Sequence, residues 1–198
     1  MSEKKYKYKK DNSIVNPNLN EYELSTYEYY ELYMFFVTYS MCGNQSLKKK
    51  SLEDYGWEGT SFRNSGLMSE LEKVLKLNGN ENFSFCEDGN LCDAFRKCNL
   101  EDGEDVSVDT ERAVIAKTSE DNKYLKLFHR IRNGLSHGSF SLRNNLHGQK
   151  MIVIQDQDKN NVTARIVIRL DTLLCFIRTI DRSHLITKVD DTGERKIA

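Results

Sequence analysis

The residues with the clearest chemical potential lie between positions 130 and 137: Arg130, Arg132, Asn133 and His137. Histidine can act as an acid or a base near neutral pH, because its ordinary pKa is about 6.5. The planar guanidinium of arginine binds phosphate through a rigid fork of donors, and asparagine can orient a phosphate or a ribose. Together these side chains are suited to acid–base chemistry at a phosphodiester.

The segment around these residues carries charge of one sign. Residues 122–155 contain no Asp or Glu, although about five would be expected in 34 residues of this chain, and ordinary surfaces mix both signs. The segment holds six basic residues and three of the four histidines: Lys123, Lys126, Arg130, Arg132, Arg143, Lys150, His129, His137 and His147. The whole chain has a net charge of −1, so the positive charge is local. Such a patch indicates an anionic partner.

RNA is the polyanion that these residue types could both bind and cut. Its 2′-hydroxyl is the nucleophile, so cleavage needs a base, an acid for the departing 5′-oxygen and positive charge at the phosphorane. Hydrolases built on two metals need clustered carboxylates, which this segment lacks. We therefore expect no metal and no cofactor. RNA contacts are expected from Lys126, Arg130, Arg143 and His147, and His129 is expected to be structural or peripheral.

The chemical residues should lie on a helix over about residues 109–135, either continuous or broken near residues 119–122, that stops near Gly138. The periodicity predicts a buried stripe of Tyr124, Phe128, Ile131 and Leu135, and an exposed face with Arg130, Asn133 and His137. On an ideal helix, however, Arg132 and His137 point about 140° apart. Either the helix loosens at Gly134 or a partner chain completes the site.

The other segments predict a mainly α fold. Helices are expected over residues 26–41, 66–77 and 91–98, with Ser25 or Thr26 as the first cap, and a final helix begins at Asp171 or Thr172. Alternation over residues 162–170, after a turn signal at 156–161, predicts an appended β-hairpin at about residues 150–170. A basic, flexible tail over residues 1–20 would precede one helical domain over residues 21–198.

The cysteines and the apolar segments of the sequence also indicate the cellular compartment. Five cysteines at irregular spacing do not indicate a disulfide framework, and the spacing of Cys86, Cys92 and Cys98 fits no metal motif. No apolar run approaches the roughly 20 residues that span a membrane, and the first residues lack the apolar region of a secretory signal. The sequence predicts a cytoplasmic protein with no membrane partner.

The segment Arg132-Asn133-Gly134-Leu135-Ser136-His137 resembles the signature of the HEPN superfamily, in which an Arg-Asn pair precedes a His. The string IRNGLSHG at residues 131–138, followed by a hairpin and a last helix, is similar to one subgroup. The resemblance implies a HEPN-like helical bundle that works as a homodimer and a metal-independent endoribonuclease of toxin–antitoxin or antiphage systems. It implies that Arg132 stabilises the phosphate, that Asn133 supports it and that His137 is the acid–base residue.

One position departs from the family pattern, and two other functions remain open. Some members carry a tyrosine, the target of a regulatory nucleotidyltransferase, where this chain has Ser139. Other members keep the motif but act as sensors or binding modules. The alternatives are therefore a non-catalytic HEPN module that binds RNA or a partner, and a helical structural or interaction dimer. An antitoxin or regulatory protein would be a further partner of a toxin.

Overall fold

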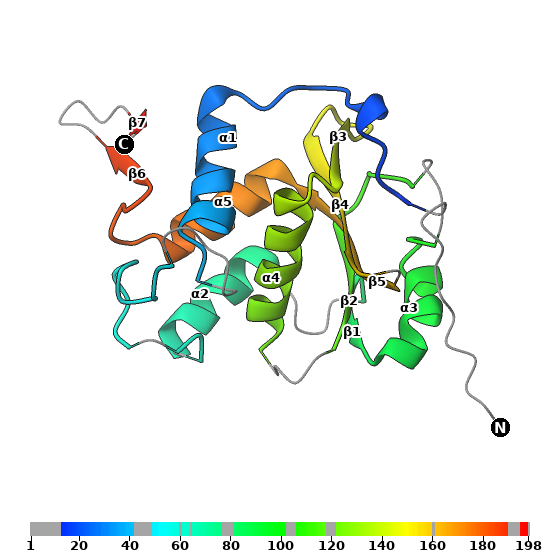
Figure 1. Cartoon of the computed structure of the whole chain (residues 1–198), viewed down its shortest axis with the longest axis horizontal. Helices are drawn as coiled ribbons and strands as arrows, with labels where there is room; N and C mark the ends of the chain where they lie inside the picture. The colour runs from blue at the N-terminus through cyan, green and yellow to red at the C-terminus, as the bar shows by residue number, and fades with distance from the viewer. Residues whose placement is uncertain are drawn as a thin grey trace. The chain divides into compact units, whose positions relative to one another are not determined.

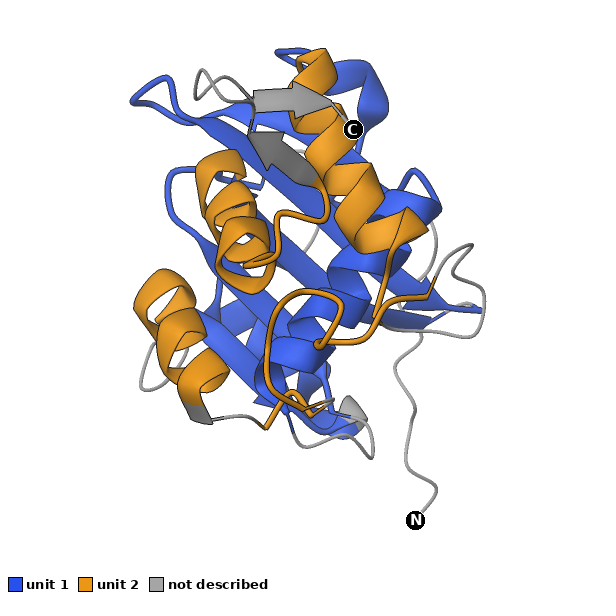
Figure 2. Ribbon diagram, turned by 90° about the vertical axis from the view of Figure 1, so that its left-hand side faces the viewer, with its two compact units in different colours: residues 1–23, 80–169 blue, residues 24–79, 170–198 orange. Residues whose placement is uncertain are grey.

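A computed structural model describes residues 13–41, 49–59, 61–63, 65–76, 81–101, 106–117, 122–159, 161–189 and 195–197. The chain divides into two compact units (Figure 2). Unit 1 comprises residues 1–23 and 80–169, and unit 2 comprises residues 24–79 and 170–198. The lysines of the expected tail, at positions 4, 5, 7, 9 and 10, lie outside the described residues.

Unit 1 is built on a five-stranded mixed sheet. Its strands are β1 (Phe83–Cys86), β2 (Arg112–Ala116), β3 (Phe140–Asn144), β4 (Lys150–Asp158) and β5 (Asn161–Arg169). The strand order is β1-β2-β5-β4-β3, in which β1 and β2 run parallel and the other neighbours run antiparallel. Residues before the sheet pair with β3, because Glu21 N–H donates to Leu142 O at 2.8 Å and Leu142 N–H donates to Asn20 Oδ1 at 2.8 Å.

Two helices lie on opposite sides of this sheet (Figure 1). Helix α3 (Leu91–Lys97) connects β1 to β2, and α4 (Lys123–Ser136) connects β2 to β3. The α3 side is filled by a hydrophobic cluster that includes Phe95, Val114, Val153 and Val167. Side chains alternate along a strand, so the neighbours Ile115, Ile154 and Ile166 face the α4 side, and all three are fully buried. The central strands are therefore covered on both faces.

Unit 2 is helical. It contains α1 (Thr26–Tyr33), which continues into a π-helical segment (Met34–Thr38), α2 (Ser65–Leu75), α5 (Leu170–Ile180) and the short strands β6 (Thr187–Val189) and β7 (Arg195–Ile197). Helix α5 packs against α1 and α2, with the rings of Phe36 and Phe176 stacked at a centroid distance of 6.2 Å. Trp57 Nε1 donates to Ile180 O at 2.8 Å, which ties the loop before α2 to the end of α5.

The expected mainly α fold is wrong, because unit 1 is an α/β structure. Strand β2 lies inside the predicted helix at 109–135, and β3 is a strand that was not predicted from the sequence. Strands β4 and β5 form the predicted hairpin but stand within the sheet and are not an appendage. The error has a physical origin, since a short apolar strand buried on both faces has the same residue pattern as a piece of buried helix.

Several helices predicted from the sequence are present in the structure. Ser25 caps α1 in a capping box with Glu28, and the helices predicted at 66–77 and 91–98 correspond to α2 and α3. The capping signals are local in sequence, so they do not depend on the rest of the fold. Over the part of the chain described, no helix is both long and apolar enough to cross a membrane.

Candidate active site

The chemical residues of the motif lie at the end of α4, which is defined by caps at both ends. The side chain of Asn122 accepts from Tyr124 N–H and Leu125 N–H and begins the helix. At the other end, Ser139 N–H donates to Gly134 O at 2.8 Å and Gly138 N–H to Leu135 O at 3.3 Å, with Gly138 at φ +64°. These two bonds form a Schellman motif, which places the exposed His137 at the C-cap.

Gly134 brings this helix close to the sheet. A Cβ at this position would collide with Ile154 Cγ2 on β4, where Ile154 is fully buried. Only glycine therefore permits the observed approach of α4 to β4. Gly134 thus has a packing role in the motif. Because it lets α4 approach β4, it also brings the adjacent Asn133 close to β4.

We expect Gly134→Ala to destabilise the protein. Overpacking typically costs about 1–3 kcal/mol, which exceeds the gain of about 1 kcal/mol in helix propensity when alanine replaces glycine. The midpoint of urea unfolding should therefore fall. Gly89→Ala is the matched control, because an added Cβ at Gly89 meets no atom within 4 Å. A midpoint that rises for Gly134→Ala would contradict the close packing of α4 on β4.

The carboxylate of Asp156 on β4 binds two side chains of α4, those of Arg130 and Asn133. Asp156 is only 3% exposed, and its Oδ2 accepts from Arg130 Nη1 at 2.8 Å, Thr163 Oγ1 at 3.0 Å and Asn133 Nδ2 at 3.4 Å. We call Asp156, Arg130, Asn133 and Thr163 the Asp156 cluster. It joins two residues of α4 to β4 and β5. The side chain of Arg130 is 11% exposed, so its ion pair with Asp156 is mostly shielded from solvent.

Arg132 is held by its neighbour in the sequence. Its Nη1 donates to Asn133 Oδ1 at 3.0 Å, so the guanidinium connects through Asn133 to Asp156. The buried Nε of Arg132 has no hydrogen-bond partner among the described residues. Orphaned buried donors are rare, and a catalytic role is one of the accepted explanations. Arg132 is therefore held at Nη1 by Asn133, while its Nε has no partner among the described residues.

Helix α4 runs without a break from Lys123 to Ser136, and His137 N–H donates to Asn133 O at 3.0 Å. The expectation that the helix could loosen at Gly134 is wrong. Arg132 and His137 consequently keep the separation of about 140° around the helix axis that the 3.6-residue period dictates. Completion of the site by a partner chain stays a prediction.

A second histidine lies close to the motif. Desolvation lowers the pKa of His129, and the positive charges of Arg130 and Arg132 lower it further, while Asp156 acts in the opposite direction. His129 therefore carries less positive charge near neutral pH than an ordinary histidine does. His129 was expected to be structural or peripheral, but it interacts electrostatically with Arg130, Arg132 and Asp156.

The residues predicted to contact RNA are less available than the sequence implied. Lys126 is 7% exposed, and Arg130 is paired with Asp156. Arg143 lies in β3, where its Nε donates to Glu21 Oε1 at 3.2 Å. His147 is exposed in the turn between β3 and β4. The assignment of these four residues to RNA binding stays a prediction.

The segment without acids is thus partly neutralised in the folded chain. Asp156 and Glu21, which lie outside residues 122–155, pair with Arg130 and Arg143. Asp109 accepts from Leu146 N–H, which is the main cause of its lowered pKa, and it also interacts electrostatically with His147. Asp156 was not among the predicted site residues, because residues 156–161 were expected to form a turn. The available signal was the position of Asp156 as the first acid after the basic segment.

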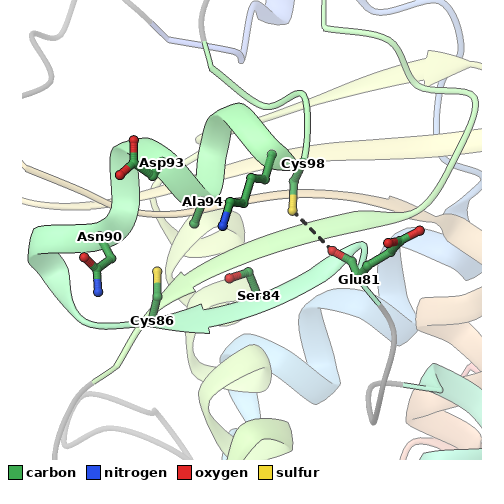
Figure 3. A pocket seen from close by; sticks show the side chains of 8 residues that line it. Glu81, Ser84, Cys86, Asn90, Asp93, Ala94 and Cys98 are labelled. Atoms are coloured by element: carbon green, nitrogen blue, oxygen red, sulfur yellow. Dashed lines mark hydrogen bonds between the residues drawn. The ribbon is translucent and has the colours of Figure 1, made fainter.

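A separate hollow of about 280 Å³ lies between β1 and α3 (Figure 3). Cys86 and Cys98 line it, and Cys98 Sγ donates to Glu81 O at 3.6 Å. Burial raises the pKa of the Cys98 thiol. Among the described residues, no group of three His, Cys, Asp or Glu side chains is arranged to hold a metal ion. The hollow belongs to the α3 side of the sheet and is not part of the site on α4.

Comparison with known families adds one finding. A model of the family described as HEPN pEK499 p136 matches residues 5–191. No curated protein and no solved structure matches the chain. The matched range includes Arg132, His137 and the whole Asp156 cluster.

Proposed function

Because the chain belongs to the HEPN family described as HEPN pEK499 p136, we propose that it is a metal-independent endoribonuclease that cleaves RNA through the 2′-hydroxyl. Family membership indicates a ribonuclease or an RNA-binding module. The arrangement of the end of α4 supports the more specific function. An arginine with an unsatisfied Nε precedes an exposed histidine at the helix end, and both lie in the HEPN motif.

In this mechanism Arg132 and His137 have different tasks. The guanidinium of Arg132 binds the scissile phosphate and stabilises the charge that develops on the phosphorane. Asn133 supports this group through the bond from Arg132 Nη1 to Asn133 Oδ1. His137, exposed at the C-cap, accepts the proton of the 2′-hydroxyl or protonates the departing 5′-oxygen. The chemistry supplied by these residues requires no further cofactor.

Homodimerisation belongs to the same proposal. One imidazole cannot be base and acid in the same step, and on the continuous helix Arg132 and His137 point away from each other. A two-fold arrangement would bring Arg132 of one chain near His137 of another, so that two imidazoles and two guanidiniums line one cleft. By the same family resemblance, the dimer would act in a toxin–antitoxin or antiphage system, with an antitoxin or regulatory protein as a further partner.

A non-catalytic module that binds RNA is the second candidate. It is favoured by the pairing of Arg130 with Asp156 and of Arg143 with Glu21, because these bonds reduce the positive charge available to a substrate. A module of this kind would bind RNA through Arg132 and the exposed His147 without breaking a bond. Cleavage by the purified protein distinguishes the two functions.

We expect purified protein to cleave a mixed RNA substrate in the presence of EDTA and to leave 2′,3′-cyclic phosphate and 5′-hydroxyl ends. The internal nucleophile gives the cyclic phosphate, and no step needs a metal ion. Product ends can be identified by mass spectrometry, and the association state of the same sample by light scattering. Inhibition by EDTA would contradict the metal-free chemistry, and an active monomer would contradict the shared cleft. Binding without cleavage would favour the second candidate.

A further inference from the structure

Asp156 is the least expected member of the site. The carboxylate is 3% exposed on β4 and is reached by donors from α4 and β5. All three of these contacts converge on one oxygen, Oδ2. A buried carboxylate needs such partners to offset its desolvation.

Asp156 fixes which way the amide of Asn133 faces. An ionised carboxylate only accepts hydrogen bonds, so Asn133 must turn its NH₂ group toward Asp156 Oδ2. Its carbonyl oxygen, Oδ1, is then directed to Arg132 Nη1, 3.0 Å away. If the amide were reversed, its NH₂ group would face the guanidinium, and two donors would oppose each other. Asp156 therefore determines the orientation of the Asn133 amide, and that amide in turn orients the guanidinium of Arg132.

Arg130 keeps the carboxylate from cancelling the charge of Arg132. Its Nη1 lies 2.8 Å from Asp156 Oδ2, the shortest of the three contacts, and forms the ion pair. Among the described residues no acid forms an ion pair with Arg132, which instead donates to the neutral Asn133. The positive charge of Arg132 thus stays available to an anion, while its position is set by an acid two hydrogen bonds away.

We propose that Asp156 is a positioning residue, which acts through Asn133 to orient the guanidinium of Arg132 for binding the scissile phosphate. The inference rests on the proposed ribonuclease function for the identity of the anion. The orientation of Arg132 itself does not depend on that function. A misplacement of about 1 Å at a catalytic group can lower a rate about a hundredfold, so the effect on kcat should be measurable.

The test compares two double variants that both lack the ion pair. Asp156→Asn with Arg130→Met keeps a carbonyl acceptor for Asn133, whereas Asp156→Leu with Arg130→Met removes it in a side chain of similar size. Replacing both members of a buried pair avoids an unpaired buried charge. We expect kcat for RNA cleavage to be about tenfold to a hundredfold lower for the Leu variant than for the Asn variant. Their unfolding midpoints should be similar.

The second readout does not need cleavage. Exchange of the Arg132 Nε–H with solvent can be followed by NMR, with its signal assigned from Arg132→Lys. We expect faster exchange in the Leu variant, because Nε is buried when Asn133 holds the guanidinium. A further Asn133→Ala change should abolish the difference between the two double variants, since the effect runs through Asn133.

Each result decides between the two proposals. Equal kcat values in the two double variants of an active enzyme would overturn the positioning role. If the native protein does not cleave RNA but Nε–H exchange differs as expected, the ribonuclease function falls and the positioning role stands. If cleavage is absent and exchange is equal, both fall. Persistence of the difference without Asn133 would also overturn the proposed route.

Discussion

Replacing His137 with alanine is expected to lower the rate of RNA cleavage by about 10² to 10⁴-fold, the usual contribution of a general acid or base. His137 is exposed at the C-cap of α4, and the Schellman bonds at this helix end are made by the backbone. Its side chain can therefore be removed without loss of the fold. The comparison is made from kcat under saturating RNA, with thermal unfolding measured on the same samples.

Arg132→Ala should lower kcat about 10² to 10³-fold, because one charged donor to the phosphorane is lost. His184→Ala is the control, since His184 lies in unit 2, away from the motif helix in sequence. Unchanged cleavage by His137→Ala would contradict the assigned acid–base role. If His129→Ala were then inactive, the role would pass to the histidine whose pKa is lowered beside Arg130.

Asp156→Ala is expected to reduce the free energy of unfolding by about 3–5 kcal/mol, the cost of breaking a buried ion pair from one side. The change leaves Arg130, at 11% exposure, without its carboxylate, and it removes the acceptor of Asn133 and Thr163. Chemical denaturation followed by circular dichroism measures the loss. Arg130→Glu should also lower the free energy of unfolding, because it removes the partner of the buried Asp156. For this variant we expect the loss in free energy of unfolding to exceed the loss in free energy of RNA binding.

Asp93→Ala provides the comparison for this stability effect. Asp93 pairs with Arg96 at 3.2 Å, but both side chains are more than 60% exposed. Exposed pairs contribute at most about 1 kcal/mol, so the unfolding midpoint should move little. Equal effects of Asp156→Ala and Asp93→Ala would mean that the Asp156 pair is screened as a surface pair is, contrary to its burial.

The local parts of the fold could be predicted because their signals are adjacent in sequence. Ser25 and Glu28 form the capping box of α1, and Gly138 ends α4 where a stop was expected. The sheet could not be predicted in this way. Strand β2 pairs with β5 across about fifty residues, with Val114 opposite Arg165, and it is buried on both sides. Its short apolar run does not show the alternation that identifies a half-exposed strand.

The site shows the same division. Arg132, Asn133 and His137 were predicted through the resemblance of residues 132–137 to the HEPN signature, and in the structure all three lie at the end of one helix. Asp156 could not be found, because its relation to Asn133 depends on the pairing of β4 and β5 and on the approach of α4 at Gly134. A gap in acidic residues along the sequence also does not imply a gap in space, since Glu21 reaches Arg143 from the start of the chain.

The bonds that residues 20 and 21 make to β3 have a consequence for solubility. Strand β3 stands at one end of the sheet, where unpaired backbone groups would invite another chain to add a strand and aggregate. Asn20 and Glu21 occupy backbone groups of Leu142 and Asn144 instead. Residues 20 and 21 therefore hinder the pairing of β3 with a strand of another molecule. A second copy that added a strand to β3 would first have to displace these two residues.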